Sequence, residues 1–194
     1  MKKGDYLKSI RKGNIHIENG FFSDENYELL VNKIEKLNFI ETYQPATEFY
    51  GNRFQAQPTW EYSGIENLHK NLKKEFISNL ENILDIKIKS YKTVIRKTIT
   101  SEILKSKVNT KYGLIHRDSV GEDDFCDIAG VLYFTQSYDG GTAFFEKEFD
   151  KYPDIEISAY PNRLIMYDAR RSHASCHDFT FEDRYVLAFA IKCF

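Results

Sequence analysis

The sequence lacks the features that mark secreted, membrane and disulfide-rich proteins. Only three of its 194 residues are cysteines, Cys126, Cys176 and Cys193, and their spacing suggests no disulfide framework. No apolar run is long enough to span a membrane, and residues 1–20 contain no apolar signal-peptide core. We therefore expect a cytoplasmic protein in a reducing compartment.

An excess of charge of either sign is also missing. The formal net charge is -2, so no basic surface for nucleic acid is indicated, and neither a nucleic-acid nor a membrane partner is expected. Internal repeats and low-complexity stretches are absent. A chain of this length can bury one good core, which predicts a single domain over residues 1–194.

The first part of the chain, residues 1–85, carries helical patterns. Apolar residues recur at helical spacing after Ser23, which predicts a helix from residue 24 to about 37. A stronger amphipathic pattern predicts a second helix from Ser63 to about Leu84, with Ser63 and Glu66 as a capping box.

Residues 86–194 change to short β-rich runs with turn signals at 138–141 and 160–162. We expect a mostly β fold, a double-stranded β-helix (jelly-roll, cupin-like), with the N-terminal helices buttressing the outside of its larger sheet. The strands predicted by these runs are 86–100, 102–108, 112–117, 127–136, 142–146, 155–159, 163–168 and 184–193.

Between the two predicted helices lies an aromatic-rich segment, residues 41–62, that carries no clear periodicity. A loop of this length is usually functional or disordered, and its aromatic content argues against disorder. Two interpretations stay open: a lid that faces the substrate, and a loop that only packs on the barrel. If it is a lid, Tyr50, Arg53 and Trp60 are the candidate substrate contacts.

His116 and Asp118 form a His-x-Asp pair within a run predicted to be extended. Side chains alternate along a strand, so both point to one face and can reach one metal ion. His173 follows another strand-like run, residues 163–167, that would return it beside the pair. Two imidazoles and one carboxylate are the ligands of mononuclear Fe(II) centres that activate oxygen.

Other interpretations of these residues are weaker. His177 could replace His173, but His173 leaves a longer separation before the last strand, enough for a turn. A zinc site that also uses Cys176 is possible in principle, yet no Cys-x-x-Cys pair is present. The kinase-like His116-Arg117-Asp118 lacks the Gly-rich loop and the Asp-Phe-Gly motif of protein kinases.

Arg184 opens the last strand-like run, eleven residues after His173. A guanidinium there suits bidentate binding of a carboxylate, such as the distal carboxylate of 2-oxoglutarate. A closed zinc site would leave this arginine unexplained.

Further motifs arrive in a fixed order around these residues. Gly130-Val-Leu-Tyr133-Phe is followed by Gly140-Gly-Thr-Ala-Phe144 and then by Pro161-Asn-Arg-Leu-Ile-Met-Tyr167. Together with the order His-x-Asp, His, Arg, the region from about 112 to 191 resembles the Fe(II)/2-oxoglutarate-dependent dioxygenases, especially their prolyl-4-hydroxylase-like branch.

The resemblance implies that His116, Asp118 and His173 hold Fe(II), and that Arg184 and Tyr133 hold the C5 carboxylate of 2-oxoglutarate. It also implies hydroxylation of an aliphatic C–H with O2, giving succinate and CO2 as co-products. The substrate class would be a small molecule, an amino acid or a peptide, prolyl residues included. Asp118 favours hydroxylation, because halogenating relatives lack this carboxylate.

Two further classes of protein would fit a jelly-roll. One is a non-catalytic binding module for a sugar or small acid, or a pseudoenzyme whose metal is structural. The other is a cupin-type oxygenase that needs no 2-oxoglutarate. The intact triad argues against the first class, and Arg184 argues against both.

Overall fold

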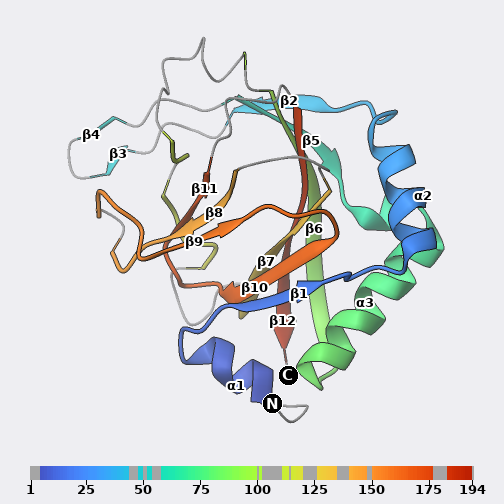
Figure 1. Cartoon of the computed structure of the whole chain (residues 1–194), viewed down its shortest axis with the longest axis horizontal. Coiled ribbons are helices and arrows are strands. Elements are labelled where there is room, and N and C mark those ends of the chain that lie inside the picture. Colours follow the sequence, from blue (N-terminus) through green and yellow to red (C-terminus); the bar gives the residue numbers. More distant parts are fainter. Residues whose placement is uncertain are drawn as a thin grey trace.

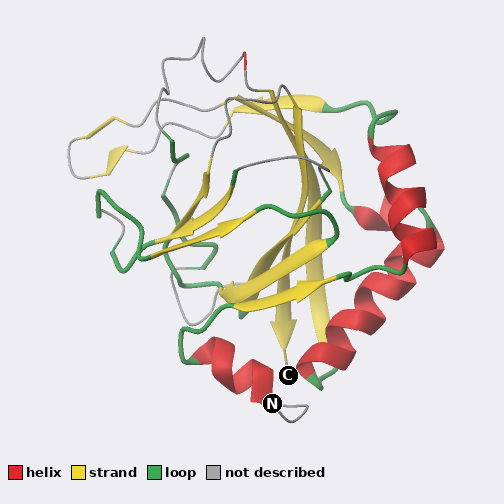
Figure 2. Ribbon diagram, in the orientation of Figure 1, coloured by secondary structure: helices red, strands yellow, loops and turns green. Residues whose placement is uncertain are grey.

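The computed structural model describes residues 5–43, 48–49, 52–53, 58–99, 101, 111–113, 115–119, 126–134, 140–147, 150–176 and 183–193. Within these ranges the chain forms a seven-stranded and a three-stranded antiparallel sheet, with helices on the outer side of the larger one (Figures 1 and 2). No helix among the described residues is long and apolar enough to cross a membrane.

The larger sheet has the order β1-β10-β7-β12-β6-β5-β2. Its strands are β1 (His16–Asn19), β10 (Arg163–Asp168), β7 (Ile128–Tyr133), β12 (Asp183–Cys193), β6 (Ile88–Ile99), β5 (Pro58–Ser63) and β2 (Ile40–Tyr43). The smaller sheet consists of β11 (His173–Cys176), β8 (Gly141–Phe144) and β9 (Ile155–Ser158), in that order. A short separate pair joins β3 (Glu48–Phe49) to β4 (Asn52–Arg53).

The helices are α1 (Asp5–Arg11), α2 (Asp24–Ile34) and α3 (Lys70–Leu84), with a 3-10 turn at Ile65–Asn67. Every fourth residue of α3 from Leu72 to Leu84 is buried, so one stripe of the helix faces the sheet. The ring of Phe76 packs edge-on against Phe189 of β12, with 5.4 Å between centroids. The helices thus buttress the larger sheet, which confirms the predicted jelly-roll with supporting helices.

Side chains alternate along β12. One set packs in a core between the larger sheet and the helices, the helix-side core, and the other set packs in a second core between the two sheets. Leu187 and Ile191 belong to the helix-side core, whereas Val186 packs with Tyr133 and Phe144 between the sheets. The face of the larger sheet that is turned away from the helices therefore faces the smaller sheet. Polar side chains on that face can come together between the two sheets.

The predicted helix over 63–84 begins later in the structure. Ser63 ends β5 and pairs with Val94 of β6, so its backbone is extended and the proposed capping box is wrong. Glu66 instead accepts a hydrogen bond of 2.7 Å from the Thr93 hydroxyl. His69 caps α3, where its Nδ1 accepts from the backbone N–H of Asn71 at 3.3 Å.

The helix predicted over 24–37 is also shorter than expected, because α2 ends at Ile34. Ser23 does not cap it through its side chain; the backbone N–H of Ser23 donates to Glu75 of α3 at 2.7 Å. The Ser23 hydroxyl also donates to Glu75, at 3.2 Å, so Ser23 links the start of α2 to α3.

The prediction that residues 41–62 have no regular structure is wrong at both ends of the segment. Its first residues belong to β2 and its last to β5, and these strands pair with Glu41 opposite Trp60. β5 also pairs with β6, so both strands join the larger sheet. Hydrogen bonds between the strands satisfy backbone N–H and C=O groups that a loop would expose to water. Residues 44–47, 50–51 and 54–57 lie outside the described residues, so the lid stays a prediction.

Other strands differ in detail. The predicted strand 102–108 lies outside the described residues. Of the predicted strand 112–117, the described residues 112–113 and 115–117 form bridges to β11 at Tyr112 and His116 but no extended ladder. The sequence analysis did not predict β11, since four residues containing a serine give a weak pattern. The predicted turn at 160–162 is present, with Asn162 in the left-handed conformation at φ 58°.

Candidate metal centre and adjoining cavity

His116 and His173 are placed opposite each other by the backbone. The N–H of His116 donates to the carbonyl of His173, and the N–H of His173 donates back to His116, each at 2.9 Å. Two residues further on, the N–H of Asp118 donates to the carbonyl of Ala169 at 2.9 Å, which ties this segment to the end of β10. The backbone therefore fixes the three predicted ligands before any metal binds.

The side chains of these three residues converge. One donor atom from each of them lies within 4.8 Å of the other two. Nε2 of His116 is 3.8 Å from Oδ1 of Asp118, and Nε2 of His173 is 3.4 Å from Oδ2 of the same carboxylate. Two imidazole nitrogens and a carboxylate oxygen at these separations suit one divalent transition metal.

The hydrogen bonds of His173 prepare it as a ligand. Its Nδ1 lies 3.0 Å from the carbonyl oxygen of Arg171, which can only accept, so Nδ1 carries the proton and Nε2 presents its lone pair. Burial, followed by the nearby charge of His116, lowers the pKa of His173 to about 4. The ring is therefore neutral at physiological pH, as a metal ligand must be.

Tyr167 is a part of this centre that the sequence analysis did not single out. Its hydroxyl lies 3.0 Å from Nε2 of His173 and 3.4 Å from Oδ2 of Asp118. Burial and the adjacent Asp118 carboxylate raise the pKa of Tyr167 well above its usual value, so the phenol keeps its proton. It can donate a hydrogen bond to either ligand.

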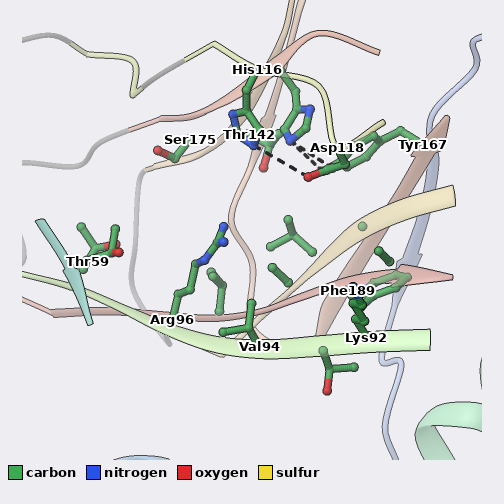
Figure 3. A pocket seen from close by; sticks show the side chains of 18 of the residues that line it. Thr59, Lys92, Val94, Arg96, His116, Asp118, Thr142, Tyr167, Ser175 and Phe189 are labelled. Carbon is green, nitrogen blue, oxygen red and sulfur yellow. Dashed lines mark hydrogen bonds and ion pairs between the residues drawn. The ribbon is translucent and has the colours of Figure 1, made fainter. Parts of the chain in front are cut away.

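The centre opens into a cavity of about 380 Å³ between the two sheets (Figure 3). One wall comes from β6, β12 and β7 of the larger sheet, and the other from β8 and β11 with the His116 segment. Apolar side chains on the first wall include Val94, Val131 and Val186. Polar side chains reach the cavity from both walls.

Arg184 lines the cavity and is 6% exposed. Its Nη2 donates to the carbonyl of Gly141 at 2.9 Å, and its guanidinium carbon lies 5.9 Å from the centre of the Tyr133 ring. The Tyr133 hydroxyl is 2.7 Å from Oγ1 of Thr142, which itself lines the cavity. Burial raises the pKa of Tyr133 to about 12, so the phenol remains neutral.

The structure thus brings Arg184 and Tyr133 together, as predicted, and adds Thr142 between Tyr133 and the cavity. Thr142 lines the cavity and Tyr133 lies directly behind it, while the predicted role of Tyr133 toward 2-oxoglutarate stays a prediction. Thr142 belongs to the Gly-Gly-Thr motif, which was a signal that could have identified it.

Of the remaining candidates, the structure describes the side chain of Trp60 alone. Trp60 does not line the cavity, although the residue before it, Thr59, does. Tyr50, His177 and the side chain of Arg53 lie outside the described residues. Their roles stay predictions.

The zinc alternative finds no support in the part of the chain that the structure describes. Cys176 is buried and belongs neither to the cavity lining nor to the cluster of potential metal ligands. Burial raises the pKa of its thiol to about 11, which disfavours the thiolate that zinc binds.

Neither a protein-family profile nor a curated protein matches the sequence. Solved structures do match the fold. A prolyl-4-hydroxylase of Pseudomonas putida aligns with a TM-score of 0.65 at 10% identity, covering 97% of each chain. A prolyl hydroxylase of Trichoplax adhaerens, in complex with a peptide fragment of hypoxia inducible factor, aligns with a TM-score of 0.63 at 13% identity, covering 95% of this chain and 86% of that one.

A third similar structure is HygX of Streptomyces hygroscopicus with nickel and 2-oxoglutarate bound. It aligns with a TM-score of 0.62 at 10% identity, over 98% of this chain and 87% of its own. The chain therefore shares the fold of these solved structures, which agrees with the jelly-roll expected from the sequence.

Proposed function

We propose that the protein is an Fe(II)- and 2-oxoglutarate-dependent oxygenase. It hydroxylates an aliphatic C–H of a small molecule, an amino acid or a peptide, and it forms succinate and CO2 as co-products. The observation that carries the proposal is the convergence of His116, Asp118 and His173 on one point at the wall of a cavity that also contains Arg184.

The donor set fits iron. His116, Asp118 and His173 supply three ligand atoms, so a six-coordinate metal ion bound by them would keep positions open for 2-oxoglutarate and oxygen. Iron bound there, with 2-oxoglutarate, supplies the oxidation that hydroxylates the C–H bond. HygX, which shares this fold, binds nickel and 2-oxoglutarate, and this supports the assignment of both groups.

Arg184 binds the C5 carboxylate of 2-oxoglutarate in this proposal. Its guanidinium is nearly buried, so a charge-assisted pair with a carboxylate is strong there, and the planar fork gives the pair a fixed orientation. The Thr142 hydroxyl, held by Tyr133, offers one further hydrogen bond at the same end of the cavity.

Apolar residues of the cavity limit the access of water to the proposed site. Val131, Val186 and Ala188 give the cavity apolar lining. An apolar wall strengthens the polar contacts of a bound co-substrate and reduces side reactions with solvent.

The test is the release of succinate from 2-oxoglutarate in the presence of Fe(II) and a panel of amino acids and peptides. We expect Fe(II)-dependent succinate in the wild type, and a loss of at least about a hundredfold in His116→Ala and Asp118→Ala, since each removes a metal ligand. His69→Asn is the matched control, because His69 caps α3 and takes no part in the cavity.

Binding of 2-oxoglutarate without any succinate would instead identify a pseudoenzyme. Oxygen consumption without a requirement for 2-oxoglutarate would identify a cupin-type oxygenase. Either result would reject the proposed reaction.

A further inference from the structure

A second guanidinium, that of Arg96, lies in the same cavity. Arg96 sits on β6 between Val94 and Thr98, and all three line the cavity because alternate residues of a strand share a face. The neighbouring Ile95 points the other way, into the core beneath the helices. Figure 3 shows Arg96 extending from β6 toward the side of the cavity that carries His116 and Ser175.

Arg96 is held in place by one carboxylate. Its Nε donates to Oε1 of Glu61 at 2.9 Å, and Glu61 lies directly opposite it on β5. The two terminal amino groups of Arg96 have no hydrogen-bond partner within the described part of the chain. A guanidinium has five N–H donors, so this contact orients the group and leaves its forked end for another acceptor.

The co-substrate does not need this second cation. 2-Oxoglutarate has two carboxylates, and the proposed function uses one at the metal and the other at Arg184. Arg96 and Arg184 lie on adjacent strands of one face, where Arg96 pairs with Val186 and Arg184 with Thr98. The side chain of Arg96 is 32% exposed, so the forked end that Glu61 leaves unused can be reached from the cavity.

We propose that Arg96 binds a carboxylate of the substrate, so that the enzyme acts on a free amino acid or another small carboxylic acid. This inference rests on the proposed function. The hydroxyls of Thr59 and Thr98 line the same part of the cavity and can accompany the carboxylate. The volume of about 380 Å³ lies at the small end of ligand pockets, which suits 2-oxoglutarate with one small substrate.

The experiment measures binding rather than turnover. Protein loaded with Ni(II) and 2-oxoglutarate is titrated calorimetrically with the common amino acids and simple carboxylic acids, each beside its primary amide. We expect at least one acid to bind and its amide to bind about tenfold more weakly or worse, since the amide lacks the charge-assisted contact.

Arg96→Gln should weaken binding of that acid by about tenfold or more, and Arg96→Lys should recover part of the loss. Both variants should keep the 2-oxoglutarate constant within about twofold, because Arg184 is intact. Lys89→Gln is the matched control, as it removes a positive charge from an exposed position near the start of β6 that does not line the cavity. Thermal unfolding of each variant verifies that it is folded.

Three results would overturn the inference. They are equal binding of acid and amide, absence of binding by every acid, and unchanged acid affinity in Arg96→Gln. A 2-oxoglutarate constant raised about tenfold in Arg96→Gln would assign Arg96 to the co-substrate and also overturn it. By contrast, a wild-type protein that binds no 2-oxoglutarate would reject the proposed function itself.

Discussion

Tyr167 joins two of the three proposed metal ligands through one hydroxyl. When Nε2 of His173 binds a metal, the phenol remains available to donate to Oδ2 of Asp118, from which it is 3.4 Å away. Groups that orient metal ligands in this way contribute substantially to metal affinity. Tyr167 is thus a positioning residue for the carboxylate.

We predict that Tyr167→Phe raises the Fe(II) dissociation constant by about tenfold, because the carboxylate loses its hydrogen-bond donor. The constant is measured by anaerobic competition with a chromophoric chelator. Tyr160→Phe is the matched control, since Tyr160 is exposed and lies in a turn before β10. Iron affinity equal to the wild type in Tyr167→Phe would remove the tyrosine from the centre.

The residues of the candidate site differ in how well they could be predicted from the sequence. The convergence of His116, Asp118 and His173 beside a cavity that Arg184 lines could be anticipated from the sequence, because the chemistry of a metal site restricts residue types and their order. Tyr167 and Arg96 could not, since their role depends on which face of a strand turns inward and on what the opposite sheet presents. Neither Tyr167 nor Arg96 is part of a residue spacing that is rarer than chance would give.

At the scale of elements, β8 and β9 approach unusually closely at Gly141. A Cβ on this residue would lie 2.0 Å from the carbonyl oxygen of Ile157, which is backbone and has little freedom to move. Gly141 also provides the carbonyl that accepts from Arg184. The glycine therefore connects strand pairing to the position of the arginine.

We predict that Gly141→Ala lowers the free energy of unfolding by about 1–3 kcal/mol, because the methyl group forces the two strands apart. Urea denaturation measures this change. The dissociation constant of 2-oxoglutarate should rise in the same variant, since the displaced carbonyl no longer orients Arg184. Unfolding at the wild-type urea midpoint would show that the strands accommodate the methyl group.

Elements were predictable where one pattern dominated and uncertain where two competed. The stripe on α3 and the alternation of β12 gave strong signals, and both elements are present. At Ser63 the capping pattern competed with strand pairing, and the hydrogen bonds to β6 prevailed. Such long-range pairing is absent from any local window of sequence.

At the scale of the whole molecule, several weak acids are buried in neutral form. Burial raises the pKa of Cys176 and of Cys193 to about 11, and that of Tyr133 to about 12. In the unfolded chain thiols lose their protons near pH 8.5 and phenols near pH 10. Above about pH 9 the folded state therefore binds more protons than the unfolded state.

Stability should accordingly fall as the pH rises from about 9 toward 11, because alkali favours the state that releases protons. Urea denaturation at a series of pH values measures the trend. Cys193→Ala should flatten the curve over the lower part of this range, since it removes one of the buried acids. A free energy of unfolding that stays level or rises up to pH 11 would contradict the burial of these groups.

The fold as a whole was predictable because two independent signals agreed. The series of short strands indicated a jelly-roll, and the order of the motifs resembled one branch of oxygenases with that fold. What the sequence left open is the substrate, since the residues proposed to meet it, such as Arg96 and Thr59, come from separate strands whose pairing only the structure reveals.

The most direct test of the account is an anaerobic absorption titration with Fe(II) and 2-oxoglutarate. We predict a weak visible charge-transfer band, because iron held by His116, Asp118 and His173 would still be able to bind 2-oxoglutarate as a chelate. The band should be lost in His173→Ala, and in Arg184→Ala it should need at least about tenfold more 2-oxoglutarate. A wild-type protein that binds Fe(II) and gives no band at saturating 2-oxoglutarate would contradict the account.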